Sequence, residues 1–132
     1  LAVGVALAEA LQAQSRTASP RVALKWPNDL WLVGEQAAHG RKFGGVLIET
    51  LAAGAARLAV VGIGINIAPV EAPAADLAGR AGCLRELDPR ATAPDTLSRI
   101  ALPLVQALRT FEREGFPAFA ERFAALDALR GR

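Results

Sequence analysis

Residues 42–67, KFGGVLIETLAAGAARLAVVGIGINI, contain two apolar segments joined by a short stretch that includes Gly54. The segments 42–51 and 57–67 are rich in the branched apolar residues that favour β-strands. The connection 52–56 is short enough for a hairpin. The sequence therefore predicts a pair of adjacent strands at the centre of the chain.

Alternation along these strands predicts two faces of different composition. The core face of the second strand is predicted to carry Ala59, Val61, Ile63, Ile65 and Ile67, and the other face Leu58, Val60, Gly62, Gly64 and Asn66. In the first strand, Lys42, Gly44, Val46 and Ile48 are predicted to share one face, and Phe43, Gly45, Leu47 and Glu49 the other.

Glycines within a strand indicate close approach of a ligand or of another backbone, a bulge, or tight packing. For Gly62 and Gly64 alone, the ligand and packing interpretations carry equal weight. GIGIN is not the dinucleotide-binding fingerprint, because no helix follows it directly and Pro69 intervenes. No phosphate-binding loop of the Walker type is present in the sequence either.

The flanking sequence predicts more strands and helices. Segment 21–26 is predicted to form a strand that enters a turn at 27–29, followed by a short strand at 30–33 and connections at 34–40 and 68–82. Helical patterns cover 1–14, a segment from Thr92 to Gly115, and 117–129. Strands in the middle and helices at both ends predict an α+β fold, with a mixed or antiparallel central sheet covered by helices on one face.

Composition narrows the classes of function. The 132 residues suffice for one domain, and 52% hydrophobic residues with a mean hydropathy of +0.27 argue against disorder. No apolar run reaches membrane-span length, and a net charge of +2 with dispersed arginines argues against nucleic-acid binding. A single cysteine, Cys83, and a single histidine argue against disulfides and zinc, and favour the reducing cytoplasm. Because the sequence contains no methionine, we expect it to be part of a longer protein.

Scarce residue types gather in one region of the chain. The only lysines, asparagines and tryptophans lie between positions 25 and 66: Lys25, Lys42, Asn28, Asn66, Trp26 and Trp31. Within KWPNDLWL, residues 25–32, the Pro-Asn-Asp sequence predicts a turn, in which Asp29 caps backbone amides or serves a ligand. For both tryptophans, burial in the core is the preferred interpretation.

Three segments, KWPNDLWL (25–32), KFGGVLIET (42–50) and VVGIGINI (60–67), occur in the order and at the spacing found in the central catalytic domain of biotin–protein ligases. The resemblance covers nearly the whole chain, and KWPND is its most specific part. It implies the biotin/lipoate ligase catalytic-domain fold, which is related to class II synthetases. Residues 1–132 would then be a partial catalytic domain that lacks an upstream Gly/Arg-rich loop and a downstream small β-barrel.

The resemblance also implies a reaction. Such an enzyme uses ATP, with Mg²⁺, to activate biotin as biotinyl-5′-adenylate, and then transfers biotin to a lysine of a biotin carboxyl carrier domain. We expect the 132 residues to be inactive alone and to be capable of forming a homodimer. The alternatives are a lipoate-type acyl ligase on the same fold and a non-catalytic module for dimerisation or carrier docking.

Site residues follow from the resemblance position by position. Lys42 is expected to contact biotin near its carboxylate and the adenylate linkage, and Lys25 to lie near the ATP phosphates, both as catalytic residues. Gly44 and Gly45 are expected to leave room beside the biotin rings.

Three further residues are expected on the nucleotide side of the site. Asn28 and Asp29 would order the nucleotide, Asp29 by positioning Lys42 or by binding Mg²⁺, and Asn66 would contact the nucleotide. The resemblance implies no other metal ligand.

Overall fold

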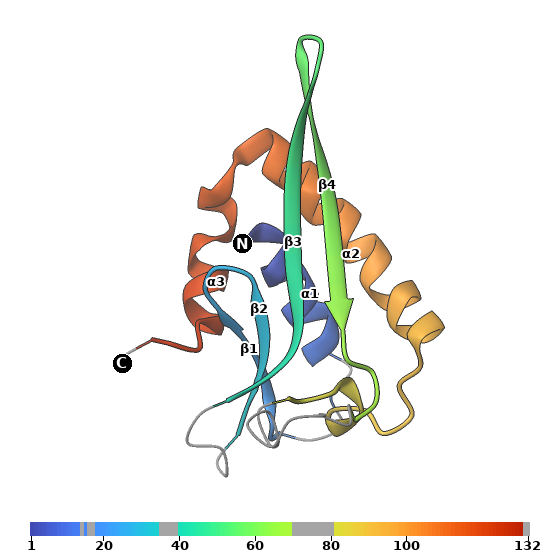
Figure 1. Ribbon diagram of the computed structural model, residues 1–132. Helices are drawn as coiled ribbons and strands as arrows, with labels where there is room; N and C mark the ends of the chain where they lie inside the picture. The colour runs from blue at the N-terminus through green and yellow to red at the C-terminus, as the bar shows by residue number, and fades with distance from the viewer. Residues whose placement is uncertain (14, 16–17, 35–39, 70–80, 131–132) are drawn as a thin grey trace.

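The computed structural model describes residues 1–13, 15, 18–34, 40–69 and 81–130 (Figure 1). Its elements are, in order, α1 (Ala2–Gln12), β1 (Arg21–Lys25), β2 (Asp29–Val33), β3 (Arg41–Ala53), β4 (Ala56–Ile65), the 3₁₀ helix η2 (Leu84–Glu86), α2 (Ala93–Glu114), the 3₁₀ helix η3 (Phe116–Phe119) and α3 (Ala120–Leu126). The predicted α+β class is confirmed. Most of the predicted connections 34–40 and 68–82 lies outside the described residues.

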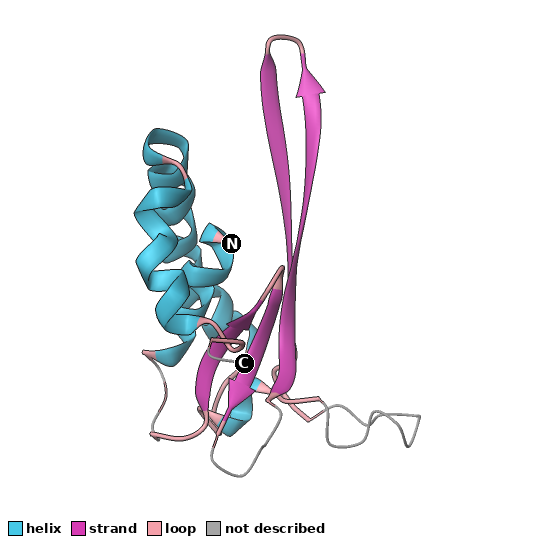
Figure 2. Ribbon diagram, turned by 90° about the vertical axis from the view of Figure 1, so that its left-hand side faces the viewer, coloured by secondary structure: helices cyan, strands magenta, loops and turns pink. Residues whose placement is uncertain are grey.

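The described strands form one antiparallel sheet in the order β1-β2-β3-β4. The predicted hairpin is confirmed: Ala53 pairs with Ala56, and Gly54 in the turn has a φ of +61°, a conformation that glycine adopts without steric cost. Figure 2 shows β3 and β4 extending far beyond β1 and β2. The two short strands therefore sit beside only one end of the long hairpin.

The helices cover one face of the sheet, as predicted, and leave the other open (Figure 2). Helix α1 consists largely of apolar residues because it lies between the sheet and α2, and its Leu7 and Leu11 are buried. The sheet contributes three buried side chains to the same core, those of Leu30, Leu32 and Phe43. The predicted core residues Val61, Ile63, Ile65 and Ile67 pack against this core, whereas Ala59 is exposed. None of the described helices is long and apolar enough to cross a membrane.

A β-bulge changes the predicted faces of β3. Leu30 pairs with Gly44 but Trp31 pairs with Lys42, so Phe43 is an extra residue in β3. The bulge moves Lys42 onto the open face with Gly45, while Gly44 lies on the helix-covered face with the buried Leu30. The prediction that Lys42 and Gly44 share a face was wrong, because strict alternation assumes that no residue is inserted.

Gly44 is needed for packing inside the sheet. A Cβ atom at Gly44 would lie 2.7 Å from the carbonyl oxygen of Gly64 and 3.0 Å from Cδ1 of Leu30. We expect Gly44→Ala to lower the free energy of unfolding by about 1–3 kcal/mol, because the backbone oxygen can move only by disturbing the β3–β4 pairing.

Gly64→Ala is the matched control, since a Cβ atom at Gly64 would meet nothing within 4 Å. Its stability should equal that of the wild type or slightly exceed it. Unfolding in urea measures both variants, and equal losses at the two positions would contradict the packing assigned to Gly44.

The predicted last helix is divided and shorter than expected. Residues 116–119 form a 3₁₀ helix, and α3 ends at Leu126. Asp127 instead forms a parallel bridge with Leu24, and the Ala128 N–H donates to the Leu24 carbonyl at 2.8 Å. The backbone after α3 is therefore used by β1, which the helical pattern alone does not reveal. Phe119 is buried, and Phe123 and Leu126 are partly buried against the core.

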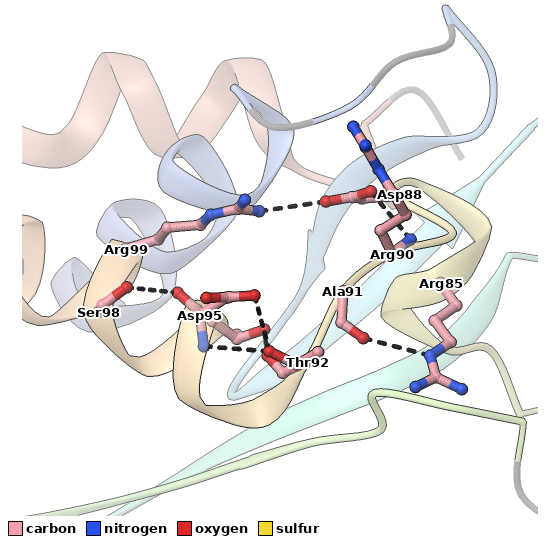
Figure 3. A network of polar contacts seen from close by, with 9 residues as sticks. Arg85, Asp88, Arg90, Ala91, Thr92, Asp95, Ser98 and Arg99 are labelled. Carbon is pink, nitrogen blue, oxygen red and sulfur yellow. Dashed lines mark hydrogen bonds and ion pairs between the residues drawn. The ribbon is translucent and has the colours of Figure 1, made fainter.

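A polar cluster precedes and begins α2 (Figure 3). The predicted helix start at Thr92 is confirmed, because the Thr92 hydroxyl oxygen accepts from the Asp95 N–H at 3.3 Å. Asp88 is only 7% exposed; its carboxylate accepts from the Arg90 N–H at 3.1 Å and from Arg99 Nη1 at 3.2 Å. These contacts connect the loop before the helix to its second turn.

The environment of Asp88 predicts a dependence of stability on pH. The hydrogen bond from the Arg90 N–H, and then that from the Arg99 side chain, lower the pKa of the Asp88 carboxyl. The Asp88 carboxyl therefore binds a proton less readily in the folded state than in the unfolded state. Its contribution to the free energy of unfolding is complete above the ordinary pKa of about 4, and it is lost as the pH falls through the lowered pKa of the folded state. Between about pH 5 and about pH 2, the free energy of unfolding should fall more steeply for the wild type than for Asp88→Asn. Urea unfolding across this range tests the prediction, and parallel curves would contradict it.

Candidate active site

The open face of the sheet gathers polar side chains where β1, β2 and β3 lie side by side. Lys25 pairs with Asp29, Asp29 pairs with Gly45, and Trp31 pairs with Lys42. Directly paired residues project to the same face of a sheet. Four of the predicted site residues, Lys25, Asp29, Lys42 and Gly45, therefore lie together on this face, around Trp31.

Lys42 and Asp29 form the central ion pair of the face. Lys42 Nζ lies 2.6 Å from Asp29 Oδ1, and the two side chains are 53% and 23% exposed. Within the part of the chain that the structure describes, the Asp29 carboxylate pairs with this ammonium group and accepts from no backbone amide. The lysine also lies over Gly45, where a Cβ atom would be 3.6 Å from Lys42 Cε and Nζ. The ion pair brings these two predicted site residues together, and the role of Asp29 in positioning Lys42 for a substrate stays a prediction.

Lys25 is held differently. Its Nζ lies 4.4 Å from the centroid of the Trp31 ring, a distance at which cation and ring attract. The prediction that both tryptophans lie in the core was wrong for Trp26, which is 64% exposed in the β1–β2 turn. Trp31 is partly exposed and belongs to the open face. Once the bulge in β3 is taken into account, strand alternation places Trp31 beside Lys42.

Asn28 fastens the β1–β2 turn to β3. Its Nδ2 donates to the Val46 carbonyl at 2.9 Å, and the Val46 N–H donates to the Asn28 carbonyl at 2.8 Å. Asp29, the next residue, is thereby held opposite Gly45. The observed role of Asn28 is therefore to shape the site, and its contact with a nucleotide stays a prediction.

Asn66 lies at the end of β4, near the backbone of Lys42. Its Nδ2 donates to the Gly82 carbonyl at 3.2 Å, and the Gly82 N–H donates to the Lys42 carbonyl at 2.8 Å. The Asn66 N–H donates to the Phe43 carbonyl at 2.7 Å. Asn66 thus joins β3 to the segment that follows residue 80, and its nucleotide contact also stays a prediction.

The open face is bare beside this cluster. Gly45 pairs with Gly64, and Leu47 pairs with Gly62. A Cβ atom at Gly64 would have no neighbour within 4 Å, and one at Gly62 would make only ordinary contacts of 3.5 Å or more with Leu47. Packing within the described residues therefore does not require either glycine, which favours the ligand interpretation. Gly44 does not share this surface, because it packs on the helix-covered face, and its expected place beside the biotin rings stays a prediction.

A cavity of about 290 Å³ lies beside the β1–β2 turn. Its lining includes Leu1, Gly4 of α1, Phe123 of α3 and Val46 of β3, together with Lys25, Asn28 and Asp29. The volume is at the lower end for small-molecule sites. The turn therefore borders both the open face and this cavity.

Across the ranges that the structure describes, no three His, Cys, Asp or Glu side chains are grouped as metal ligands.

The sequence of residues 1–66 matches the biotin/lipoate A/B protein ligase family. This is half of the chain, and the chain belongs to that family. Within it, the chain is 30% identical over 128 residues to the bifunctional ligase/repressor BirA of Escherichia coli, and 31% identical over 129 residues to BirA of Salmonella typhimurium. Each alignment covers 96% of this chain and 37% of the relative, so the chain spans little more than a third of these proteins.

The fold is similar to that of a biotin protein ligase from Aquifex aeolicus. The apo structure of that protein matches with a TM-score of 0.75 and 26% identity, over 99% of this chain and 53% of the other. Its complex with biotin and ATP matches with a TM-score of 0.74 and 27% identity, over 98% and 50% of the two chains. The predicted resemblance to the catalytic domain of biotin–protein ligases, which are ligase enzymes, is thereby confirmed.

Proposed function

We propose that the protein containing this chain is an ATP-dependent biotin–protein ligase that charges a biotin carboxyl carrier domain. The observation that carries the proposal is the Lys42–Asp29 ion pair, which lies across Gly45 at the start of a glycine-lined open face. The similar ligase from Aquifex aeolicus binds biotin and ATP, which supports both as substrates here.

In the first step, a biotin carboxylate oxygen attacks the α-phosphorus of ATP, and the bond to pyrophosphate breaks. Lys42 would stabilise the negative charge shared by the carboxylate and the α-phosphate, because an ammonium group aimed at developing charge lowers the barrier. Asp29 keeps the lysine side chain over the face before the substrates bind. Lys25 would neutralise charge on the phosphates.

In the second step, the uncharged amine of the carrier lysine attacks the carbonyl carbon of biotinyl-5′-adenylate. The bond from that carbon to the phosphate oxygen breaks, AMP leaves, and the nitrogen loses a proton to water as the amide forms. The exposed Lys42 would again lie beside the departing phosphate. Mg²⁺ would enter with ATP and neutralise phosphate charge. Mg²⁺ sites of this kind use one or two carboxylates and substrate phosphates, and Asp29 is the carboxylate beside Lys42 on this face.

Transfer of labelled biotin to a purified carrier domain by the intact protein tests the proposal. We expect biotin to be transferred only when ATP is present. Charging with lipoate but not biotin would favour a lipoate-type acyl ligase, and charging with neither would favour a non-catalytic docking module.

A cytoplasmic location belongs to the same proposal, and is consistent with the free, buried Cys83.

Activity of the 132 residues alone, and homodimerisation, remain proposals. Because the chain spans about half of the similar Aquifex ligase, we expect it alone to bind biotin weakly and to release no pyrophosphate. Among the described strands β4 pairs only with β3, and Leu58 and Val60 on it are exposed, which supports pairing with a second copy. Calorimetry with biotin and sedimentation of the intact protein measure these properties.

A further inference from the structure

The two lysines of the open face have exchanged partners. In the strand register Lys25 is opposite Asp29, and Lys42 is opposite Trp31. Yet the ammonium group of Lys42 contacts Asp29 at 2.6 Å, and that of Lys25 lies over the Trp31 ring at 4.4 Å. Each lysine therefore takes the diagonal partner on β2.

As a result, the Asp29 carboxylate pairs with Lys42 and not with Lys25. The ion pairs formed within the described residues do not include Lys25. An aromatic face attracts a cation through its quadrupole without cancelling the charge, whereas a carboxylate partner would compete with an incoming anion. Lys25 is thus held in place while its charge stays available.

The position of Trp31 suits this task. Trp31 lies in the middle strand of the three that form the cluster, between β1 and β3. One edge of its ring is closely packed, because a Cβ atom at Gly40 would lie 2.8 Å from Trp31 Cε3. Packing against the Gly40 backbone restricts the ring, and a restricted ring presents a fixed face to Lys25.

We infer that Trp31 is a positioning residue, which holds the Lys25 ammonium on the open face as an unneutralised receptor for the phosphates of the nucleotide. The inference rests on the proposed function, because that function supplies the nucleotide. It assigns the two lysines different electrostatic states: Lys42 is paired with a carboxylate before substrates bind, and Lys25 is not.

Steady-state kinetics of Trp31→Leu in the intact protein test the inference, with adenylate formation followed by pyrophosphate release. We expect the KM for ATP to rise about two- to thirtyfold, the range for loss of a cation–π contact, while the KM for biotin stays unchanged. Trp31→Phe keeps an aromatic face and should recover most of the loss. Trp26→Leu is the matched control, since it removes an exposed ring from the neighbouring β1–β2 turn and should leave the KM for ATP near the wild-type value.

A double-mutant cycle separates positioning from general damage to the fold. In a Lys25→Met background, Trp31→Leu should cause no further rise in the KM for ATP, because the group it positions is gone. Additive effects of the two substitutions, an equal rise for the KM values of ATP and biotin, or an unchanged KM for ATP would each overturn the inference.

A spectroscopic measurement tests the contact without activity. The ring current of Trp31 should shift the side-chain methylene protons of Lys25 upfield in the NMR spectrum of the wild type, and Trp31→Leu should abolish the shift. Absence of the shift in the wild type would overturn the inference even if Trp31→Leu did not fold. A wild-type protein that shows the shift but forms no adenylate would refute the proposed function and leave the contact standing.

Discussion

Lys42→Ala in the intact protein is expected to slow biotinyl-adenylate formation by at least about a hundredfold, the typical loss when one preorganised charge-stabilising group is removed. Lys42 is the ammonium group that the β3 bulge turns onto the open face and that Asp29 holds over Gly45. Single-turnover measurement of pyrophosphate release isolates this step. Near-normal adenylate synthesis would remove Lys42 from the site.

Lys42→Arg serves as the matched variant that keeps the charge. We expect it to restore only part of the rate, because a planar guanidinium group cannot occupy the position of a compact ammonium ion. Its ion pair with Asp29 should persist, so full recovery by arginine would show that charge alone, without position, is sufficient.

Gly64→Val is expected to weaken biotin binding by at least about tenfold, because a branched side chain would stand on the bare face that the ligand is proposed to cover. The fold should tolerate the change, since a Cβ atom at Gly64 meets nothing within 4 Å and β-branched residues suit strands. Calorimetry with biotin and urea unfolding of the intact protein measure the two effects separately.

Ala59→Val is the control for this experiment. It makes a similar small-to-branched change in the same strand, at an exposed position toward the turn of the hairpin, where Ala59 pairs with Thr50. Its biotin affinity should equal that of the wild type. A large loss of stability in Gly64→Val, with biotin binding intact, would assign Gly64 to packing.

The glycines illustrate how far sequence reasoning reached at the site. The pattern identified Gly62 and Gly64 as either a ligand surface or a packing feature, and the open space beside Gly64 favours the first. It also grouped Gly44 with Lys42, which the structure contradicts, because Gly44 packs beneath the Gly64 carbonyl. A period of two predicts faces only while each residue of one strand opposes one residue of the next.

Local signals in the sequence determined the elements of this protein. The two apolar segments around Gly54 determined the hairpin, the Pro-Asn-Asp sequence at 27–29 the turn, and Thr92 the start of α2. These features depend on backbone preferences and side chains within a few residues, so a single chain suffices to recognise them. The KWPND motif and its spacing to GIGIN likewise indicated the ligase family, which the comparisons confirm.

Contacts between distant segments were decided only by the tertiary structure. The bulge at Phe43 places Lys42 beside Asp29 and Gly45, the Lys25 ammonium lies over Trp31, and the backbone after α3 hydrogen-bonds with β1. Each depends on the register between strands or on the docking of a helix end. Free energy gained across the whole core selects those arrangements, so no short stretch of residues contains enough information to specify them.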